Sequence, residues 1–218
     1  MEVTGMESVF DGVMKFYEED YNKHKSFYEG LRENKPHILF ISCVDARVDP
    51  NRLVQAKPGE LYAIRNLGNI IPPYDDPKSS GSIGTTSAIE YAVCVLNIKT
   101  IIICGHNNCG ACRSIYRSEE ELASLPHVKK WLEFMHPVRD KVLALNPDSI
   151  TKRQWITELL NVQYQMQNLL TYPFISERFD RGALQLFGWY YTIDSGEILN
   201  YNPITREFKP ITPTSLDM

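Results

Sequence analysis

Two cysteines and a histidine in this sequence have the types and spacing of metal ligands. His106 and Cys109 lie three residues apart, where the apolar run 101–103 gives way to a glycine-flanked turn. Cys43 follows an earlier, mainly apolar segment, 37–42. Thiolate and imidazole groups suit zinc, and three protein ligands leave a fourth position open for chemistry. The pattern therefore predicts a catalytic metal site built from these three side chains.

A charged pair follows the first of these candidate ligands. Asp45 and Arg47 lie two and four residues after Cys43. A carboxylate near zinc can bind the metal itself or accept a hydrogen bond from bound water, and an arginine can keep that carboxylate ionised. On an ordinary surface loop, Asp-x-Arg is usually a solvated ion pair of little consequence. Next to a candidate ligand, both residues become candidate catalytic groups.

The hydrophobic pattern predicts how the fold brings these groups together. Mainly apolar segments at 37–42, 61–66 and 100–104 predict strands, and the first has apolar residues on both faces, as is typical of a buried parallel strand. Helical spacing occurs at 85–96 and 151–170. Strands that alternate with helices indicate an α/β domain with a mainly parallel central sheet and flanking helices. Sites in such sheets form beyond the carboxyl ends of the strands. If the strands before Cys43 and His106 are neighbours, the ligands meet there.

The helix expected at 151–170 has the clearest pattern. Its apolar residues alternate four and three positions apart, which predicts a core-facing stripe. The members of this stripe are Trp155, Leu159, Val162, Met166 and Leu169.

The 218 residues are long enough to bury a sizeable core, and we expect a single domain with distinct ends. Residues 1–33 carry apolar positions at helical spacing and predict an N-terminal helical arm that packs on the domain or on a second subunit. Residues 34–202 are the expected catalytic core, which closes with an antiparallel edge hairpin turning at 195–196. Residues 203–218 are expected to form an irregular C-terminal tail.

Composition argues against several classes of protein. The net charge is −4 without a basic stripe, which argues against a nucleic-acid partner. No apolar run approaches the roughly 18–20 residues of a membrane span, so no membrane association is expected. The acidic N-terminus resembles neither a signal nor a transit peptide, which predicts a cytoplasmic location, or an organelle if a transit peptide has been removed. Five cysteines, an odd number, favour a reducing compartment.

Two motifs resemble those of the β-class carbonic anhydrases. Residues 42–48, Ser-Cys-Val-Asp-Ala-Arg-Val, are similar to the family's Cys-x-Asp-x-Arg signature. Residues 104–111, Cys-Gly-His-Asn-Asn-Cys-Gly-Ala, are similar to its Gly-His-x-x-Cys-Gly signature. Segments 65–69 and 88–92 match in order and spacing, and the similarity covers roughly residues 34–200. Paired motifs at this separation are a much more specific signal than either motif alone.

The resemblance implies one zinc ion per chain, bound by Cys43, His106 and Cys109. It implies reversible hydration of CO₂ to bicarbonate and a proton by zinc-bound hydroxide, which Asp45 would orient while Arg47 orients Asp45. Zinc can lower the pKa of bound water to about 7, so hydroxide is available at neutral pH. The family also implies a closed state in which Asp45 becomes the fourth ligand and its pair with Arg47 breaks.

The resemblance further implies a homodimer, or a higher even homo-oligomer, with the substrate pocket at the subunit interface. The positions that align with the pocket are Asn34, Tyr62, Leu67, Tyr91 and Gly105. The family commonly has Gln at the first of these positions, and Asn34 has a shorter reach. Tyr62, Leu67 and Tyr91 fit equally well as ordinary core residues.

Three alternatives remain at this point. Carbonyl sulfide or carbon disulfide hydrolases resemble the same family and keep the same metal ligands, so that pocket shape would decide the substrate. Cys109 and Cys112 form a Cys-x-x-Cys motif that could belong to a thiol-disulfide protein. A non-catalytic, zinc-stabilised interaction protein would need a fourth ligand, for which Cys104 and Cys112 are candidates. If Cys109 binds zinc, these two cysteines are expected to be packing residues.

Overall fold

The structure is a computed structural model that describes residues 6–33, 35–74 and 83–212. The chain divides into two units, Met1–Lys35 and Pro36–Met218. The first unit contains α1 (Met6–Lys15), a π-helical stretch (Phe16–Tyr21) and α2 (Lys25–Gly30), so the expected helices are present. Apolar side chains that are more than half exposed in this unit are Val9, Phe10, Val13, Met14 and Tyr17.

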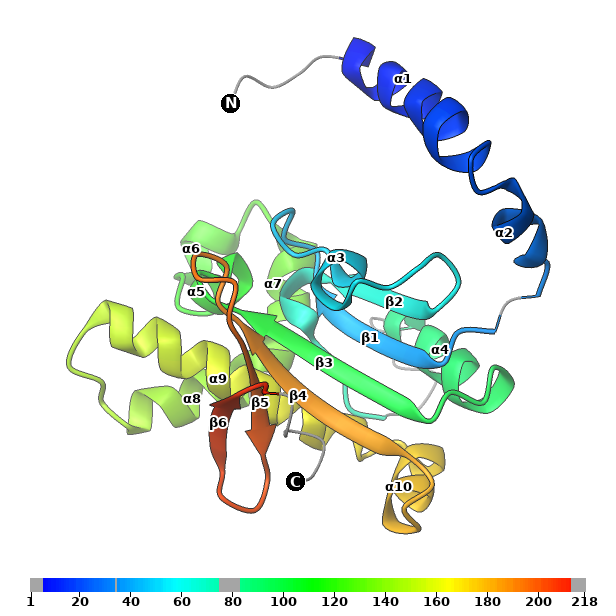
Figure 1. Cartoon of the computed structure of the whole chain (residues 1–218). Coiled ribbons are helices and arrows are strands. Elements are labelled where there is room, and N and C mark those ends of the chain that lie inside the picture. The colour runs from blue at the N-terminus through cyan, green and yellow to red at the C-terminus, as the bar shows by residue number, and fades with distance from the viewer. Residues whose placement is uncertain (1–5, 34, 75–82, 213–218) are drawn as a thin grey trace. The chain divides into compact units, whose positions relative to one another are not determined.

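The second unit is built on a six-stranded sheet in the order β2-β1-β3-β4-β5-β6 (Figure 1). Strands β1 to β6 span, in chain order, Ile38–Cys43, Leu61–Asn66, Thr100–His106, Gln185–Tyr191, Ile198–Asn202 and Glu207–Pro210. Strand β1 pairs in parallel with both β2 and β3, and β3 pairs in parallel with β4. Strands β5 and β6 are added antiparallel at one edge. The predicted fold class, a mainly parallel sheet with an antiparallel C-terminal edge, is confirmed.

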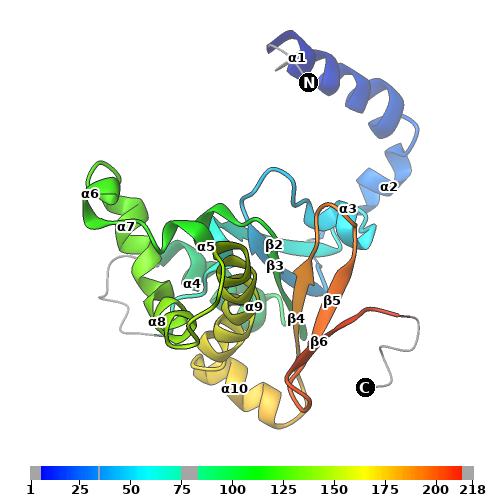
Figure 2. The ribbon, with the colours of Figure 1, turned by 90° about the vertical axis from the view of Figure 1, so that its left-hand side faces the viewer.

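The helices of this unit lie mainly on one face of the sheet (Figure 2). Helices α3 to α10 span, in chain order, Pro50–Val54, Ile83–Glu90, Gly110–Ser114, Glu119–Leu122, Pro126–Leu132, His136–Ala144, Ile150–Leu169 and Pro173–Asp180. A 3-10 turn, Leu67–Asn69, follows β2, and a π-helical stretch, Tyr91–Val95, continues α4.

Strand β1 shows why the apolar runs are continuous instead of alternating. Leu39 and Ile41 pack into the main core with α4, α9 and α10, whereas Phe40 packs on the opposite face with Leu53 and Val54 of α3. All three strand residues are completely buried. A strand that is covered on both faces needs apolar side chains at every position, as is typical of parallel sheets.

Helix α9 packs very closely against β3 and β4. A Cβ atom added to Gly105 of β3 would lie 2.5 Å from Cγ2 of Val162, and one added to Gly188 of β4 would lie 2.4 Å from Sδ of Met166. Both distances are far shorter than a normal van der Waals contact between heavy atoms. The two glycines therefore allow α9 to lie directly on β4 and on β3, the strand that ends in His106.

Two predictions about particular segments are wrong. The expected irregular tail contains β6, because Phe208 packs against Tyr201 with ring centroids 5.1 Å apart and the segment pairs with β5. In α9, Val162 and Leu169 are buried as predicted, but Trp155 is 51% exposed. The buried side of α9 also contains polar residues where apolar ones were expected. These residues are Thr157, Glu158, Asn161, Gln165 and Asn168.

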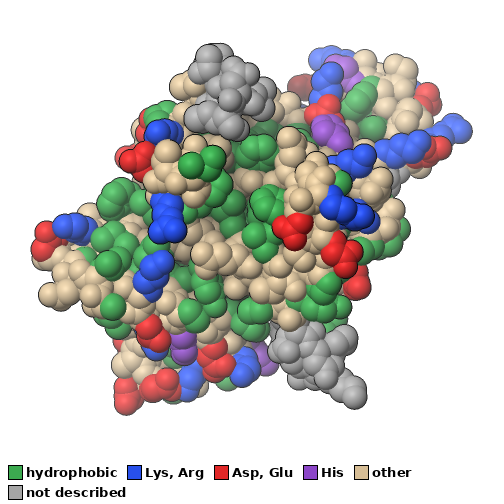
Figure 3. All heavy atoms as spheres, turned by 90° about the horizontal axis from the view of Figure 1, so that it is seen from below, with side chains coloured by type: hydrophobic (Ala, Val, Ile, Leu, Met, Phe, Trp, Pro, Cys, Tyr) green, Lys and Arg blue, Asp and Glu red, His purple; other side chains and the backbone are tan. Residues whose placement is uncertain are grey.

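The surface carries charges of both signs. Seen from below, acidic and basic side chains lie interspersed among apolar and uncharged ones (Figure 3). Among the helices of the described residues, none is both long and apolar enough to cross a membrane.

Candidate metal centre

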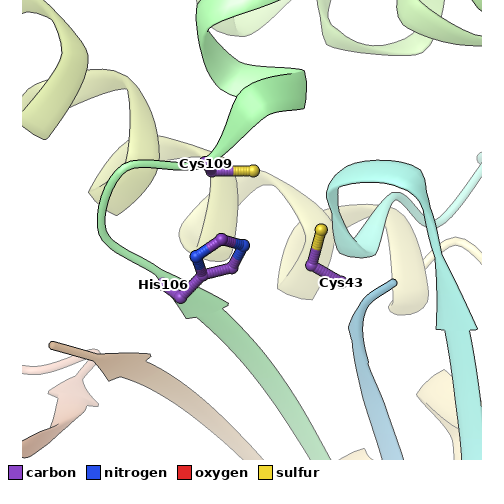
Figure 4. A group of neighbouring side chains, drawn as sticks. All are labelled: Cys43, His106 and Cys109. Atoms are coloured by element: carbon purple, nitrogen blue, oxygen red, sulfur yellow. The ribbon is translucent and has the colours of Figure 1, made fainter. Parts of the chain in front are cut away.

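The three predicted ligands meet at one end of the sheet (Figure 4). Cys43 is the last residue of β1, His106 is the last residue of β3, and Cys109 directly precedes α5. Their ligand atoms all lie within 4.8 Å of one another, and the residues are at most 3% exposed. The ligands were expected to meet only if the strands before Cys43 and His106 are neighbours, and β1 and β3 are indeed paired. This group of side chains could hold a metal ion.

The imidazole of His106 is oriented for a ligand at Nε2. Its Nδ1 lies 2.8 Å from the backbone carbonyl of Asn107, and because a carbonyl can only accept, Nδ1 carries the proton. The buried Nε2 atom then has a free lone pair, and it has no hydrogen-bond partner among the described residues. The side chain of Asn107 donates to Asp194 at 2.6 Å, which anchors the turn. Such an arrangement is typical of metal-binding histidines.

The two thiols are unfavourable as a charged pair without a cation. A hydrogen bond with Cys109, together with burial, raises the pKa of Cys43 to about 12. A hydrogen bond with Cys112, together with burial, raises the pKa of Cys109 well above its usual value. The backbone N–H of Gly68 donates to Sγ of Cys43 at 3.4 Å. A bound cation would favour the thiolates strongly, so the donor set fits a metal ion.

Asp45 and Arg47 form a bidentate ion pair beside these ligands. Nε of Arg47 donates to Oδ1 of Asp45 at 2.9 Å, and Nη2 donates to Oδ2 at 2.8 Å. These bonds hold the pKa of the Asp45 carboxyl well below its usual range. Oδ2 also lies 4.0 Å from Nε2 of His106. An ionised carboxylate therefore faces the ligand group, as the spacing predicted.

The pocket candidates do not all lie in one place. Leu67 packs in the same apolar cluster as Cys43 and Cys109. Tyr62 and Tyr91 stack on each other with ring centroids 6.3 Å apart, and Tyr62 packs on the main core. The Cβ direction of Gly105 points toward α9, as described above. Asn34 lies outside the described residues.

Cys104 and Cys112 are buried packing residues. Cys104 packs with Phe40 and Ile102 on the other side of the sheet, and burial raises its pKa to about 12. Cys112 is 1% exposed in the cluster that contains Cys109, and neither Cys104 nor Cys112 belongs to the ligand group found among the described residues. Reactive cysteines have lowered pKa values and some exposure. In the Cys-x-x-Cys motif both cysteines are buried, and the pKa of Cys109 is raised.

Sequence reasoning missed the residues that hold the ligand loops. Arg65 of β2 donates to the backbone carbonyl of Asp45 at 2.8 Å and to that of Cys43 at 3.3 Å. Glu158 and Asn161 of α9 reach the loops from the buried side. A signal was available in α9, because acidic and amide residues occur among its apolar positions, and such residues require partners when they are buried.

Known proteins share both the sequence and the fold. Residues 38–198 match the carbonic anhydrase family. A carbonic anhydrase of Helicobacter pylori J99 is 44% identical over 211 residues, which is 94% of each chain. The solved β-carbonic anhydrase CcaA superposes with a TM-score of 0.89 at 37% identity, covering 95% of this chain and 100% of that one. A tetrameric β-carbonic anhydrase from Sordaria macrospora gives 0.76 at 25% identity, with 89% and 95% covered. With two signature motifs and this fold in common, the chain belongs to the β-class carbonic anhydrase family of lyases.

Proposed function

We propose that this protein is a zinc-dependent enzyme that reversibly hydrates CO₂ to bicarbonate and a proton. The observation that carries the proposal is the convergence of Cys43, His106 and Cys109 beside an intact Asp45–Arg47 pair. Membership of the carbonic anhydrase family supports the reaction.

The types of the donor atoms are the reason for proposing zinc. Two thiolates from Cys43 and Cys109 and the Nε2 atom of His106 form the S₂N set that zinc accepts in tetrahedral sites. One ion per chain, held by these three side chains, would leave a fourth position for water or substrate. When bound, zinc lowers the pKa of coordinated water to about 7, which makes a nucleophile available at neutral pH.

Asp45 and Arg47 orient the reacting water. The carboxylate of Asp45 accepts a hydrogen bond from the reacting water, which directs the oxygen lone pair toward the carbon of CO₂. Arg47 fixes the carboxylate with two bonds and keeps it ionised, so that Asp45 acts as an acceptor only. Water and CO₂ become bicarbonate, and one proton leaves for solvent or buffer. In a closed form, Asp45 would be a fourth ligand and its pair with Arg47 would be broken.

The substrate side of the site is proposed to be apolar. Leu67 lies beside Cys43 and Cys109 and offers CO₂ a surface without hydrogen-bonding groups. Tyr62, Tyr91, Gly105 and Asn34 remain the further pocket candidates, with Asn34 contributed by a partner subunit.

An even homo-oligomer is part of the proposal. The Sordaria macrospora relative is tetrameric. In addition, α1 carries apolar side chains that are exposed in the single chain, such as Phe10 at 66% and Val13 at 59%. A second subunit would remove this apolar surface from water. Light scattering coupled to gel filtration is expected to give a dimer or a higher even oligomer, and a monomer would contradict this part.

A stopped-flow CO₂ hydration assay with a pH indicator tests the function, together with zinc analysis of the same sample. We expect about one zinc per chain and rapid hydration that falls sharply in Asp45→Asn. Zinc-loaded protein that is inert to CO₂ but hydrolyses carbonyl sulfide would overturn the proposed substrate. Metal-free protein with full activity would overturn the proposed zinc site.

A further inference from the structure

Helix α9 has a buried face made of polar residues. Glu158, Asn161, Gln165 and Asn168 follow one another at intervals of three and four residues, so they lie on one side of the helix. They are 2%, 1%, 0% and 4% exposed, respectively. Burying such groups is costly unless each has hydrogen-bond partners. The partners therefore show what this polar face is for.

Glu158 holds the backbone of one candidate ligand. Its Oε1 accepts from the backbone N–H of Cys109 at 2.9 Å and from Nε2 of Gln154 at 2.9 Å. Its Oε2 accepts from the hydroxyl of Tyr190, on β4, at 2.9 Å. The carboxylate thus connects Cys109 to a strand of the central sheet.

Asn161 reaches the other thiol ligand through one intervening residue. Its Nδ2 donates to the carbonyl of Gly68 at 3.0 Å, and the N–H of Gly68 donates to Sγ of Cys43 at 3.4 Å. Gly68 has a φ of +79°, and a Cβ atom there would lie 2.8 Å from Cβ of Ala111. The backbone of Gly68 is consequently confined between α9, α5 and the thiol of Cys43.

The same helix lies in direct contact with the strand of the third ligand. Val162 occupies the space above Gly105, which immediately precedes His106. One rigid element of 20 residues, Ile150–Leu169, therefore contacts the local backbone of all three ligands.

We propose that Glu158 and Asn161 are positioning residues that set the spacing of the two thiol ligands, Glu158 through the amide of Cys109 and Asn161 through Gly68. The proposal deepens the proposed function and rests on its zinc site. Neither side chain touches substrate, and both act through the ligand loops. Partners outside the ligand shell commonly govern metal affinity in this way.

Matched variants separate positioning from ordinary packing. Asn161→Leu and Glu158→Met remove, among others, the bonds to Gly68 and to Cys109, and Leu keeps the branched shape of Asn. Glu158→Gln is the conservative variant, since its amide oxygen can accept from Cys109 while its NH₂ group donates to Tyr190. Asn168→Leu is the control, because Asn168 is equally buried on the same face and bonds to Ile71 but to no ligand loop atom of Cys43 or Cys109.

The readouts are zinc affinity by chelator competition and the absorption spectrum of the cobalt(II)-substituted protein. We expect Asn161→Leu and Glu158→Met to bind zinc about 10- to 100-fold more weakly, with shifted thiolate-to-cobalt bands. Glu158→Gln should restore wild-type affinity and spectrum, and Asn168→Leu should lower only the melting temperature. Asn161→Ala replaces Asn161→Leu if the latter does not fold.

Wild-type zinc affinity and spectrum in both Asn161→Leu and Glu158→Met would overturn the inference, as would equal changes in Asn168→Leu. The wild-type protein serves as the reference for the proposed function. If it binds no zinc, the proposed function fails; if it binds zinc and hydrates CO₂ while the variants match it, only the positioning inference fails.

Discussion

The candidate metal centre has an exposed side, with Asp45 and Arg47, and a buried side, with Glu158 and Asn161. The side chains on the two sides are held by different kinds of interaction. On the exposed side, Asp45 and Arg47 form an ion pair in which the Arg47 side chain is 48% accessible to solvent. On the buried side, Glu158 and Asn161 are at most 2% exposed and bond to backbone groups. A solvated pair can exchange its partners for water at little cost, whereas a buried group that loses its partner stays unsatisfied.

The difference indicates a division of work between the two sides. In the proposed function, the groups that orient water and change partners during the reaction lie where water can replace a lost bond. The groups that we propose to set the spacing of the thiols are buried, away from competing water. The following predictions compare the two sides, and they are ordered from the largest expected effect to the smallest.

Loss of a metal ligand should abolish both zinc binding and activity. Cys43→Ser replaces a thiolate with a poor zinc ligand, so we expect loss of bound zinc and of CO₂ hydration together. Zinc analysis after gel filtration and the stopped-flow assay measure the two effects. Cys94→Ser, at an exposed cysteine, is the matched control and should retain both. Full activity in Cys43→Ser would show that the reaction does not need this site.

On the exposed side, Asp45→Asn should lower activity and leave zinc in place. The amide cannot act as a purely accepting carboxylate, so we expect kcat to fall by about 10²- to 10⁴-fold. Asp49→Asn makes the same charge change nearby and keeps the cap that Asp49 provides for α3, so it should be neutral. If Asp45→Asn lost zinc as well as activity, the exposed side would also contribute to zinc binding, and the proposed division between the two sides would be wrong.

On the buried side, Gly105→Ala should destabilise the fold where α9 meets β3. The added Cβ would lie 2.5 Å from Val162, whose branched side chain has little freedom to move. Overpacking of this kind costs about 1–3 kcal/mol of unfolding free energy. Gly110→Ala is the control, since no atom lies within 4 Å of its added Cβ. Urea unfolding of both variants checks this, and equal stability would show that α9 can move away.

The smallest effect is expected on the outer side of α9. Trp155 is 51% exposed, so Trp155→Ala should change the unfolding free energy by no more than about 0.5 kcal/mol. Leu169 is completely buried on the same helix, and Leu169→Ala should cost about 2–5 kcal/mol. Thermal or urea unfolding of the pair measures the contrast. A large loss in Trp155→Ala would reveal a contact that covers this side chain in the assembled protein.

The sequence alone was sufficient for the local features. Cys43, His106 and Cys109 could be recognised as candidate ligands because their residue types suit a metal and they lie at or just after the carboxyl ends of strands, where sites form in such sheets. Strand β2 was predicted at its observed bounds, Leu61–Asn66, since an apolar run between turn residues is a local signal. The tail was misjudged because β6 depends on pairing with β5.

Tertiary structure decided which distant segments meet. The bond from Cys109 to Glu158 joins residues 49 positions apart, and that from Asn161 to Gly68 joins residues 93 apart. Periodicity reports only how often apolar residues recur along a helix, so Trp155 was expected in the core. In the folded chain Trp155 is 51% exposed while Asn161, which carried no such expectation, is buried. The ligands are therefore determined locally, whereas their spacing depends on contacts that only the folded chain contains.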